Sequence, residues 1–233
     1  MTCYYPGCDA PGTTKEHIPP KSFFPDDERD QLLTVRSCEK HNNRKSKDDL
    51  YVLAQICLNA SPHNRAREIF ELRVKPQLGF NNGALRKRLA KGSVINTDGS
   101  VGYRVQVSRL DDFFDHLCFG LIFKACKASL PKRYKIRHIY HSLSGTADLR
   151  ELQLQNELLR FYSAPLPEIL DFGTPGTVNT KIYRARITGV PHFQSSITIT
   201  HTFFGKFLVT SMLSNIIGNE QGNNRQNKPD APT

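Results

Sequence analysis

The strongest hydrophobic pattern in the chain lies between residues 110 and 129, where apolar positions recur every three or four residues. Side chains at this spacing share one face of a helix, so the pattern predicts a long amphipathic helix with that face buried. Pro131 closes it, because proline cannot continue a helix. The apolar positions are Phe113, Phe114, Leu117, Leu121 and Ile122.

Weaker helical patterns predict four further helices. One begins near Cys38, after Ser37 as its N-cap, and runs through Asp49 to about Cys57. The others cover residues 63–73, a short basic segment at 85–90, and an amphipathic segment at 149–162.

Strands are predicted where apolar and polar positions alternate and β-branched or aromatic residues are frequent. A turn signal, Asn96-Thr97-Asp98-Gly99, follows Val94-Ile95 and predicts a hairpin. The predicted strands cover residues 32–35, 103–107, 136–141, 180–187 and 197–212.

Together these elements predict an α+β protein with two folded units. We expect an N-terminal unit at residues 1–58 and a mixed α/β domain at 59–217. Residues 218–233 are polar and rich in Asn, Gln, Gly and Pro, which predicts a disordered tail. The N-terminal unit is near the size at which a metal or disulfide is usually needed for stability.

Charge adds a prediction about partners. The chain carries 32 Lys and Arg against 22 Asp and Glu, a formal charge of +10. This excess favours a polyanionic partner, first nucleic acid and then an acidic membrane surface, although a merely basic protein is an equal alternative. The sequence shows no signal peptide and no apolar run long enough to span a bilayer, so we expect a cytoplasmic protein without a membrane partner.

In a reducing compartment, close pairs of soft ligands indicate metal binding more than disulfides. Cys3 and Cys8 flank the bend Pro6-Gly7, and Cys38 and His41 lie one helical turn apart. Four N and S donors suit tetrahedral Zn²⁺ in a closed structural site. The alternative is that Cys3 and Cys8 are incidental or form a disulfide. Cys57, Cys118 and Cys126 lie in apolar helical patterns and are expected to be buried small residues rather than ligands.

A second set of candidates lies between these pairs. Glu16 and His17 are adjacent in a segment that Pro19 biases toward an extended path, so their side chains point to opposite faces. Glu16 can bind a divalent cation while His17 faces an attacking water, and Asn42 can give the same cation a neutral oxygen. Such oxygen ligands suit Mg²⁺ or Mn²⁺. The alternatives are a structural role for His17 and simple solvation for Asn42.

Basic residues follow on the same predicted helix. Arg44, Lys45 and Lys47 are candidates for phosphate contacts, and an ordinary charged helix face is an equal alternative. Asp49 is about 10 Å further along the helix axis than Asn42, too far for easy co-ligation.

These residues resemble the HNH, or ββα-metal, endonucleases. The pattern of Cys3, Cys8, Glu16-His17, Cys38 and His41-Asn42 is closest to the zinc-stabilised branch, which includes phage resolvases of the endonuclease VII type. The likeness covers about residues 1–55. It departs from the family at Glu16, commonly Asp, and at His41, commonly Cys, and no third histidine follows on the helix.

The resemblance implies a treble-clef-like knot in which Cys3, Cys8, Cys38 and His41 hold structural zinc. It implies that His17 is the general base and that Glu16 and Asn42 hold the catalytic cation. We therefore predict a metal-dependent endonuclease acting on DNA, with RNA not excluded, in restriction, phage defence or a mobile element. A homodimer or a partner subunit would fit double-strand cutting. The alternative is a non-catalytic zinc-stabilised protein that binds nucleic acid or serves as a scaffold.

Overall fold

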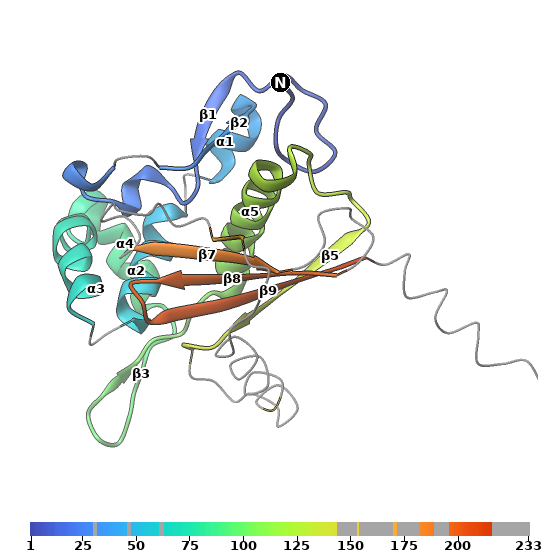
Figure 1. Ribbon diagram of the computed structural model, residues 1–233. Coiled ribbons are helices and arrows are strands. Elements are labelled where there is room, and N and C mark those ends of the chain that lie inside the picture. Colours follow the sequence, from blue (N-terminus) through green and yellow to red (C-terminus); the bar gives the residue numbers. More distant parts are fainter. Residues whose placement is uncertain are drawn as a thin grey trace, which may run out of the picture.

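The structure is a computed structural model, which describes residues 1–29, 32–45, 48–60, 63–143, 153, 170–171, 182–188 and 196–215. It contains both helices and strands, in agreement with the predicted α+β class. An antiparallel five-stranded sheet forms one layer, and the long helix α5 lies between this sheet and a small N-terminal hairpin (Figure 1). Apart from Gln153, the predicted helix at 149–162 lies outside the described residues, as does the predicted tail at 218–233.

The N-terminal segment has the order strand, strand, helix. Strand β1 (Thr14–His17) pairs antiparallel with β2 (Thr34–Ser37), and helix α1 (Glu39–Lys45) follows directly. Two short 3₁₀ helices, Lys21–Phe23 and Asp26–Glu28, lie in the connection between the strands. The predicted single helix from Cys38 to Cys57 is divided, because α2 (Asp49–Asn59) is a separate helix, of which residues Tyr51–Cys57 are buried.

Ser37 is not the N-cap that we expected, since it lies in β2 and Cys38 directly precedes the first helical residue. Beyond α2 the chain forms two more helices at one end of the molecule, α3 (Asn64–Ile69) and α4 (Phe80–Ala90). Between them run a π-helical turn at Phe70–Val74 and a 3₁₀ turn at Lys75–Gln77.

A narrow hairpin projects from the body of the molecule after α4 (Figure 1). It pairs β3 (Val94–Ile95) with β4 (Val101–Gly102), as the turn signal predicted. The predicted strand at 103–107 is wrong, because helix α5 (Val107–Cys126) already begins at its last residue.

The large sheet has the order β5-β9-β8-β7-β6, and its neighbouring strands pair antiparallel. The predicted strand at 197–212 is two strands, because Phe204 and Gly205 have positive φ and turn the chain back. The strands are β5 (Tyr134–Tyr140), β6 (Leu170–Asp171), β7 (Tyr183–Thr188), β8 (Ile197–Phe203) and β9 (Phe207–Asn215).

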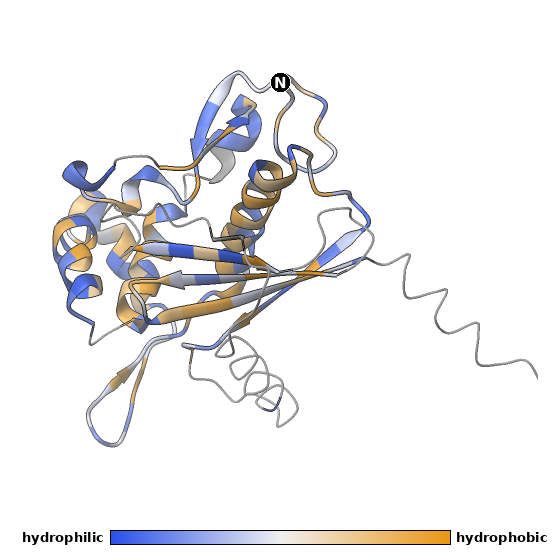
Figure 2. Ribbon diagram, viewed as in Figure 1, coloured by the Kyte–Doolittle hydropathy of each residue, from blue (hydrophilic) through white to orange (hydrophobic). Residues whose placement is uncertain are grey.

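One hydrophobic core runs through the N-terminal segment, α2, α5 and the sheet. Figure 2 shows apolar residues concentrated on α5 and on parts of α2 and the sheet. Ile18, just after β1, packs so closely against Gly120 of α5 that a Cβ at Gly120 would overlap its Cδ1 atom. The boundary at residue 58 remains a prediction, but the units on its two sides share this core. No helix in the described part of the chain is long and apolar enough to cross a membrane.

Candidate metal centre

The two pairs of soft ligands converge at the N-terminus of α1. The ligand atoms of Cys3, Cys8, Cys38 and His41 all lie within 4.8 Å of one another. Nδ1 of His41 is 3.5 Å from Sγ of Cys3 and 3.2 Å from Sγ of Cys38, and the Sγ atoms of Cys8 and Cys38 are 4.0 Å apart. The cluster can therefore hold one metal ion. All six cysteines are free, so the alternative of a Cys3–Cys8 disulfide does not apply.

A tight loop brings the first two ligands together. The backbone N–H of Cys8 donates to the carbonyl of Tyr5, and the N–H of Cys3 donates to the carbonyl of Ala10. Gly7 takes a positive φ of 66° in this loop, a conformation that glycine adopts at little cost. The x4 spacing of the cysteines is therefore accommodated by a turn built around Pro6-Gly7.

The other two ligands stand on the first turn of α1. The backbone N–H of His41 bonds to the sulfur of Cys38 and lowers the pKa of this thiol, and the N–H of Lys40 acts in the same direction. Cys38 thus caps the helix with sulfur, where a serine hydroxyl would do so with oxygen. Its own N–H donates to Sγ of Cys3 over 3.4 Å. Bonds of this kind favour thiolates, which are the form that binds a metal.

Aromatic packing fixes the ring of the fourth ligand. The ring of Tyr5 stacks on that of His41 with centroids 3.9 Å apart and planes 8° from parallel. Tyr5 in turn contacts His116 and Phe119 of α5, at centroid distances of 5.5 and 5.2 Å. Because Nδ1 of His41 faces the three sulfurs, this stacking holds the ring in the orientation that metal binding requires.

The donor set of three thiols and one imidazole fits Zn²⁺, which takes four such ligands in structural sites. Cys3 is fully buried, Cys38 and His41 are nearly so, and Cys8 is half-buried. A closed, largely buried set of four protein ligands leaves no position for a substrate. The centre is therefore suited to holding the fold rather than to chemistry.

The proposed catalytic residues lie on the elements next to this centre. Glu16 and His17 end β1, with Glu16 only 5% exposed and His17 half-buried. The carboxylate of Glu16 lies beside the hydroxyl of Tyr4; burial is the larger cause that raises the pKa of Tyr4, and Glu16 raises it further. Asn42 is half-buried on α1, directly after His41.

The predicted phosphate contacts after Asn42 cannot be placed. Arg44 and Lys45 belong to α1, but their side chains lie outside what the structure describes, as does all of Lys47. Asp48 precedes α2 and pairs with Arg109 at the start of α5. This contact indicates that Asp48 helps to join α2 and α5.

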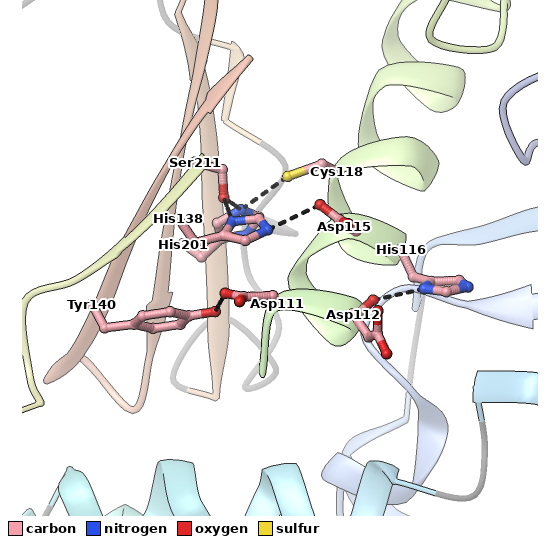
Figure 3. A network of polar contacts seen from close by, with 9 residues as sticks. All are labelled: Asp111, Asp112, Asp115, His116, Cys118, His138, Tyr140, His201 and Ser211. Carbon is pink, nitrogen blue, oxygen red and sulfur yellow. Dashed lines mark hydrogen bonds and ion pairs between the residues drawn. The ribbon is translucent and has the colours of Figure 1, made fainter. Parts of the chain in front are cut away.

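A second polar cluster, which the sequence did not reveal, lies between α5 and the sheet (Figure 3). Oδ1 of Asp115 is 3.0 Å from Nε2 of His138, and Nδ1 of His138 is 2.8 Å from Oγ of Ser211. Ser211 is in turn 3.0 Å from Nε2 of His201, whose Nδ1 is 2.9 Å from the hydroxyl of Tyr183. These five residues form a continuous chain of hydrogen bonds, which we call the buried relay.

The order Asp, His, Ser invites comparison with a nucleophilic triad, but burial argues against that role. Ser211 and His201 have no exposed surface, and Cys118, 3.6 Å from His201, is also fully buried. Burial lowers the pKa of His201 well below its ordinary value, with His138 adding to the effect, so His201 is neutral. A nucleophile needs access to its substrate, and we therefore interpret the relay as a structural network.

No local spacing could have identified the relay. His138 and His201 lie in strand segments without metal-ligand spacing, and both side chains are packed in the interior. The available signal was indirect: polar His201 and Ser211 occupy positions on the strand face that buried apolar residues otherwise fill.

Comparisons with protein-family models, with curated proteins and with solved structures find no match to this chain.

Proposed function

We propose that this chain is a metal-dependent endonuclease of the HNH type that hydrolyses phosphodiester bonds in DNA. One observation carries the proposal: the order β1–β2–α1, with Glu16-His17 at the end of β1 and the convergent ligands Cys38 and His41 at the start of α1. This is the arrangement that the sequence resemblance implies, with a structural metal centre holding a strand hairpin against a helix.

The two faces of β1 carry residues with different proposed roles. Glu16 points to the buried face, and His17 lies on the opposite face, together with Lys15. In the proposed reaction His17 accepts a proton from the attacking water, a role suited to imidazole because its ordinary pKa is near neutral pH. The Asn42 amide lies one residue beyond a metal ligand, so the metal centre fixes its position.

The donor types fit a hard divalent cation. A carboxylate from Glu16 and an amide oxygen from Asn42 are ligands that Mg²⁺ and Mn²⁺ accept. When bound, such a cation supplies positive charge to the phosphate and the leaving oxygen.

The test is nicking of supercoiled plasmid by the full chain, with Mg²⁺ or Mn²⁺ titrated. We expect the wild type to nick and His17→Ala to be at least about 100-fold slower, the range for loss of a general base. His63→Ala is the matched control, because His63 is a half-buried histidine that caps α3 and lies outside the site. If wild type and His17→Ala leave the plasmid equally intact, the proposal fails.

The burial of Glu16 specifically favours a second candidate, a non-catalytic protein whose metal centre only shapes a nucleic-acid-binding or scaffold surface. Metal analysis separates the two. The nuclease predicts a second, weaker divalent site that Glu16→Gln removes without loss of zinc. The second candidate predicts one tightly held zinc ion and no further site.

A further inference from the structure

A positively charged pocket lies between the β1–β2 hairpin and the end of α5. It has a volume of about 190 Å³, and its walls carry four cationic side chains. We call it the basic pocket and define it by these four residues: Lys15, Arg36, Lys124 and Lys127. Among the residues that the structure describes, no acidic one lines it.

The strand register places this pocket beside the proposed general base. Lys15 pairs with Arg36, and His17 pairs with Thr34. Directly paired residues, and residues two apart on one strand, share a face of a sheet. Lys15, His17 and Arg36 therefore share one face of the hairpin, the face opposite to buried Glu16.

The cations of the pocket differ in their partners from other basic residues of the chain. None of its four cations forms an ion pair within the part of the chain that the structure describes. By contrast, Arg65 pairs with Glu28, and Arg109 pairs with Asp48. Converging like charges repel one another, so their grouping indicates an anionic ligand.

Interaction with a helix C-terminus explains the positions of only two of the four cations in the basic pocket. Lys124 and Lys127 stand at the C-terminal end of α5, where cations interact favourably with the last carbonyls. Lys15 and Arg36 come from a hairpin and have no such partner. Two independent elements thus contribute cationic residues to the lining of one concavity, which helix stabilisation does not require.

We propose that the basic pocket binds the sugar–phosphate backbone of DNA and guides it to His17. The choice of DNA among polyanions rests on the proposed function. A concave pocket suits a chain of separate phosphates better than a flat bilayer surface, for which a protruding apolar face is expected. The end of α5 thereby belongs to the substrate-binding surface, which gives the region beyond the N-terminal unit a role.

Substitution of Lys127 can test the role of the pocket's charge without destabilising the fold. It follows α5 with a φ of 56°, a left-handed conformation that glycine adopts more easily than lysine. Lys127→Gly therefore removes a charge from the pocket without harming the fold, and its Tm should equal or exceed that of the wild type. A loss of binding in this variant cannot be attributed to unfolding.

The experiment measures fluorescence anisotropy of a labelled DNA duplex in buffer without free divalent cations and without chelator, so that the zinc centre stays intact. The variants are Lys127→Gly and the pair Lys15→Ala/Arg36→Ala. We expect each lost contact to weaken binding about five- to tenfold near 0.1 M salt and to lower the slope of log K against log salt by about 0.9. The control is Lys206→Ala, an exposed lysine in the β8–β9 turn, which should leave both quantities unchanged.

The outcomes separate this proposal from the nuclease proposal. If the duplex binds through the pocket but no plasmid is nicked, the DNA-binding proposal stands and the nuclease proposal fails. If the chain nicks plasmid but the pocket variants bind the duplex as tightly as the wild type, the nuclease proposal stands and the DNA-binding proposal fails. Equal losses in Lys206→Ala, or pocket-dependent binding to vesicles of acidic phospholipid but not to duplex, would also overturn it.

Discussion

Helix α5 separates two polar clusters that are built in opposite ways. On one side of α5, Tyr5 connects the metal centre to the helix by contacting His116. On the other side, Asp115 of α5 is the first residue of the buried relay. The metal centre draws its ligands from two short segments near the N-terminus. The relay draws Asp115, His138 and Ser211 from a helix and two strands.

The difference shows two ways in which buried polar groups are stabilised inside a protein. In the metal centre one ion would satisfy four ligands at once, so the segment gains stability that its small size cannot supply. In the relay each group satisfies only its neighbours, and the net gain per hydrogen bond is about 1 kcal/mol. Loss of the ion should therefore lower the free energy of unfolding far more than loss of one residue of the relay.

The largest effect is expected from Cys38→Ser, which removes a metal ligand and the sulfur cap of α1. Structural zinc contributes about 10–16 kcal/mol in small peptides, which exceeds the whole stability of many domains. We expect loss of bound zinc and of hydrogen-exchange protection in β1, β2 and α1. Elemental analysis and exchange mass spectrometry measure both. Cys126→Ser, at a half-buried cysteine outside the cluster, should keep its zinc.

Breaking the relay should cost less. Ser211→Ala removes the hydroxyl that joins His138 and His201, which leaves two ring nitrogens without this partner. An unsatisfied buried polar group costs about 1–3 kcal/mol, and zinc content should stay unchanged. Urea unfolding measures the change. Ser214→Ala on the same strand is the control and should stay within about 0.5 kcal/mol; equal effects at both positions would contradict a special role for Ser211.

The relay also predicts a pH dependence. Burial holds the pKa of His201 well below its ordinary value of 6.5, so the folded chain keeps this ring neutral. Below pH 6.5 only the unfolded chain gains the proton, so this contribution to stability is complete above pH 6.5 and is lost as the pH falls. The slope is at most about 1.4 kcal/mol per pH unit for one histidine. Unfolding free energies between pH 5 and 7, at about one-unit steps, should show a shallower slope in His201→Gln.

The smallest effect concerns the packing around the metal centre. Tyr5→Leu keeps the four ligands but removes the ring that stacks on His41. Such stacking contributes about 0.5–1.5 kcal/mol, so we expect zinc affinity to fall between about two- and tenfold. Competition with a coloured chelator measures it. Tyr103→Leu, at an exposed tyrosine before α5, should leave zinc affinity unaltered.

The sequence predicted the features that depend on local spacing. The convergence of Cys3 and Cys8 with Cys38 and His41 follows from two close pairs and one helical turn, and α5 follows from its apolar periodicity. The turn at Phe204-Gly205 was missed because both flanking strands continue the same apolar alternation. The relay and the basic pocket were missed because sheet register and helix packing, rather than spacing, bring their residues together.

The close contact between Ile18 and Gly120 couples two positions that are about a hundred residues apart in sequence. Because α5 has no room for a side chain there, a larger residue at 120 would fit only beside a smaller one at 18. In diverged descendants of this chain the two positions should therefore change together. The N-terminal hairpin and α5 should therefore be inherited as one unit, and exchange of the hairpin alone between such proteins would disrupt this fit.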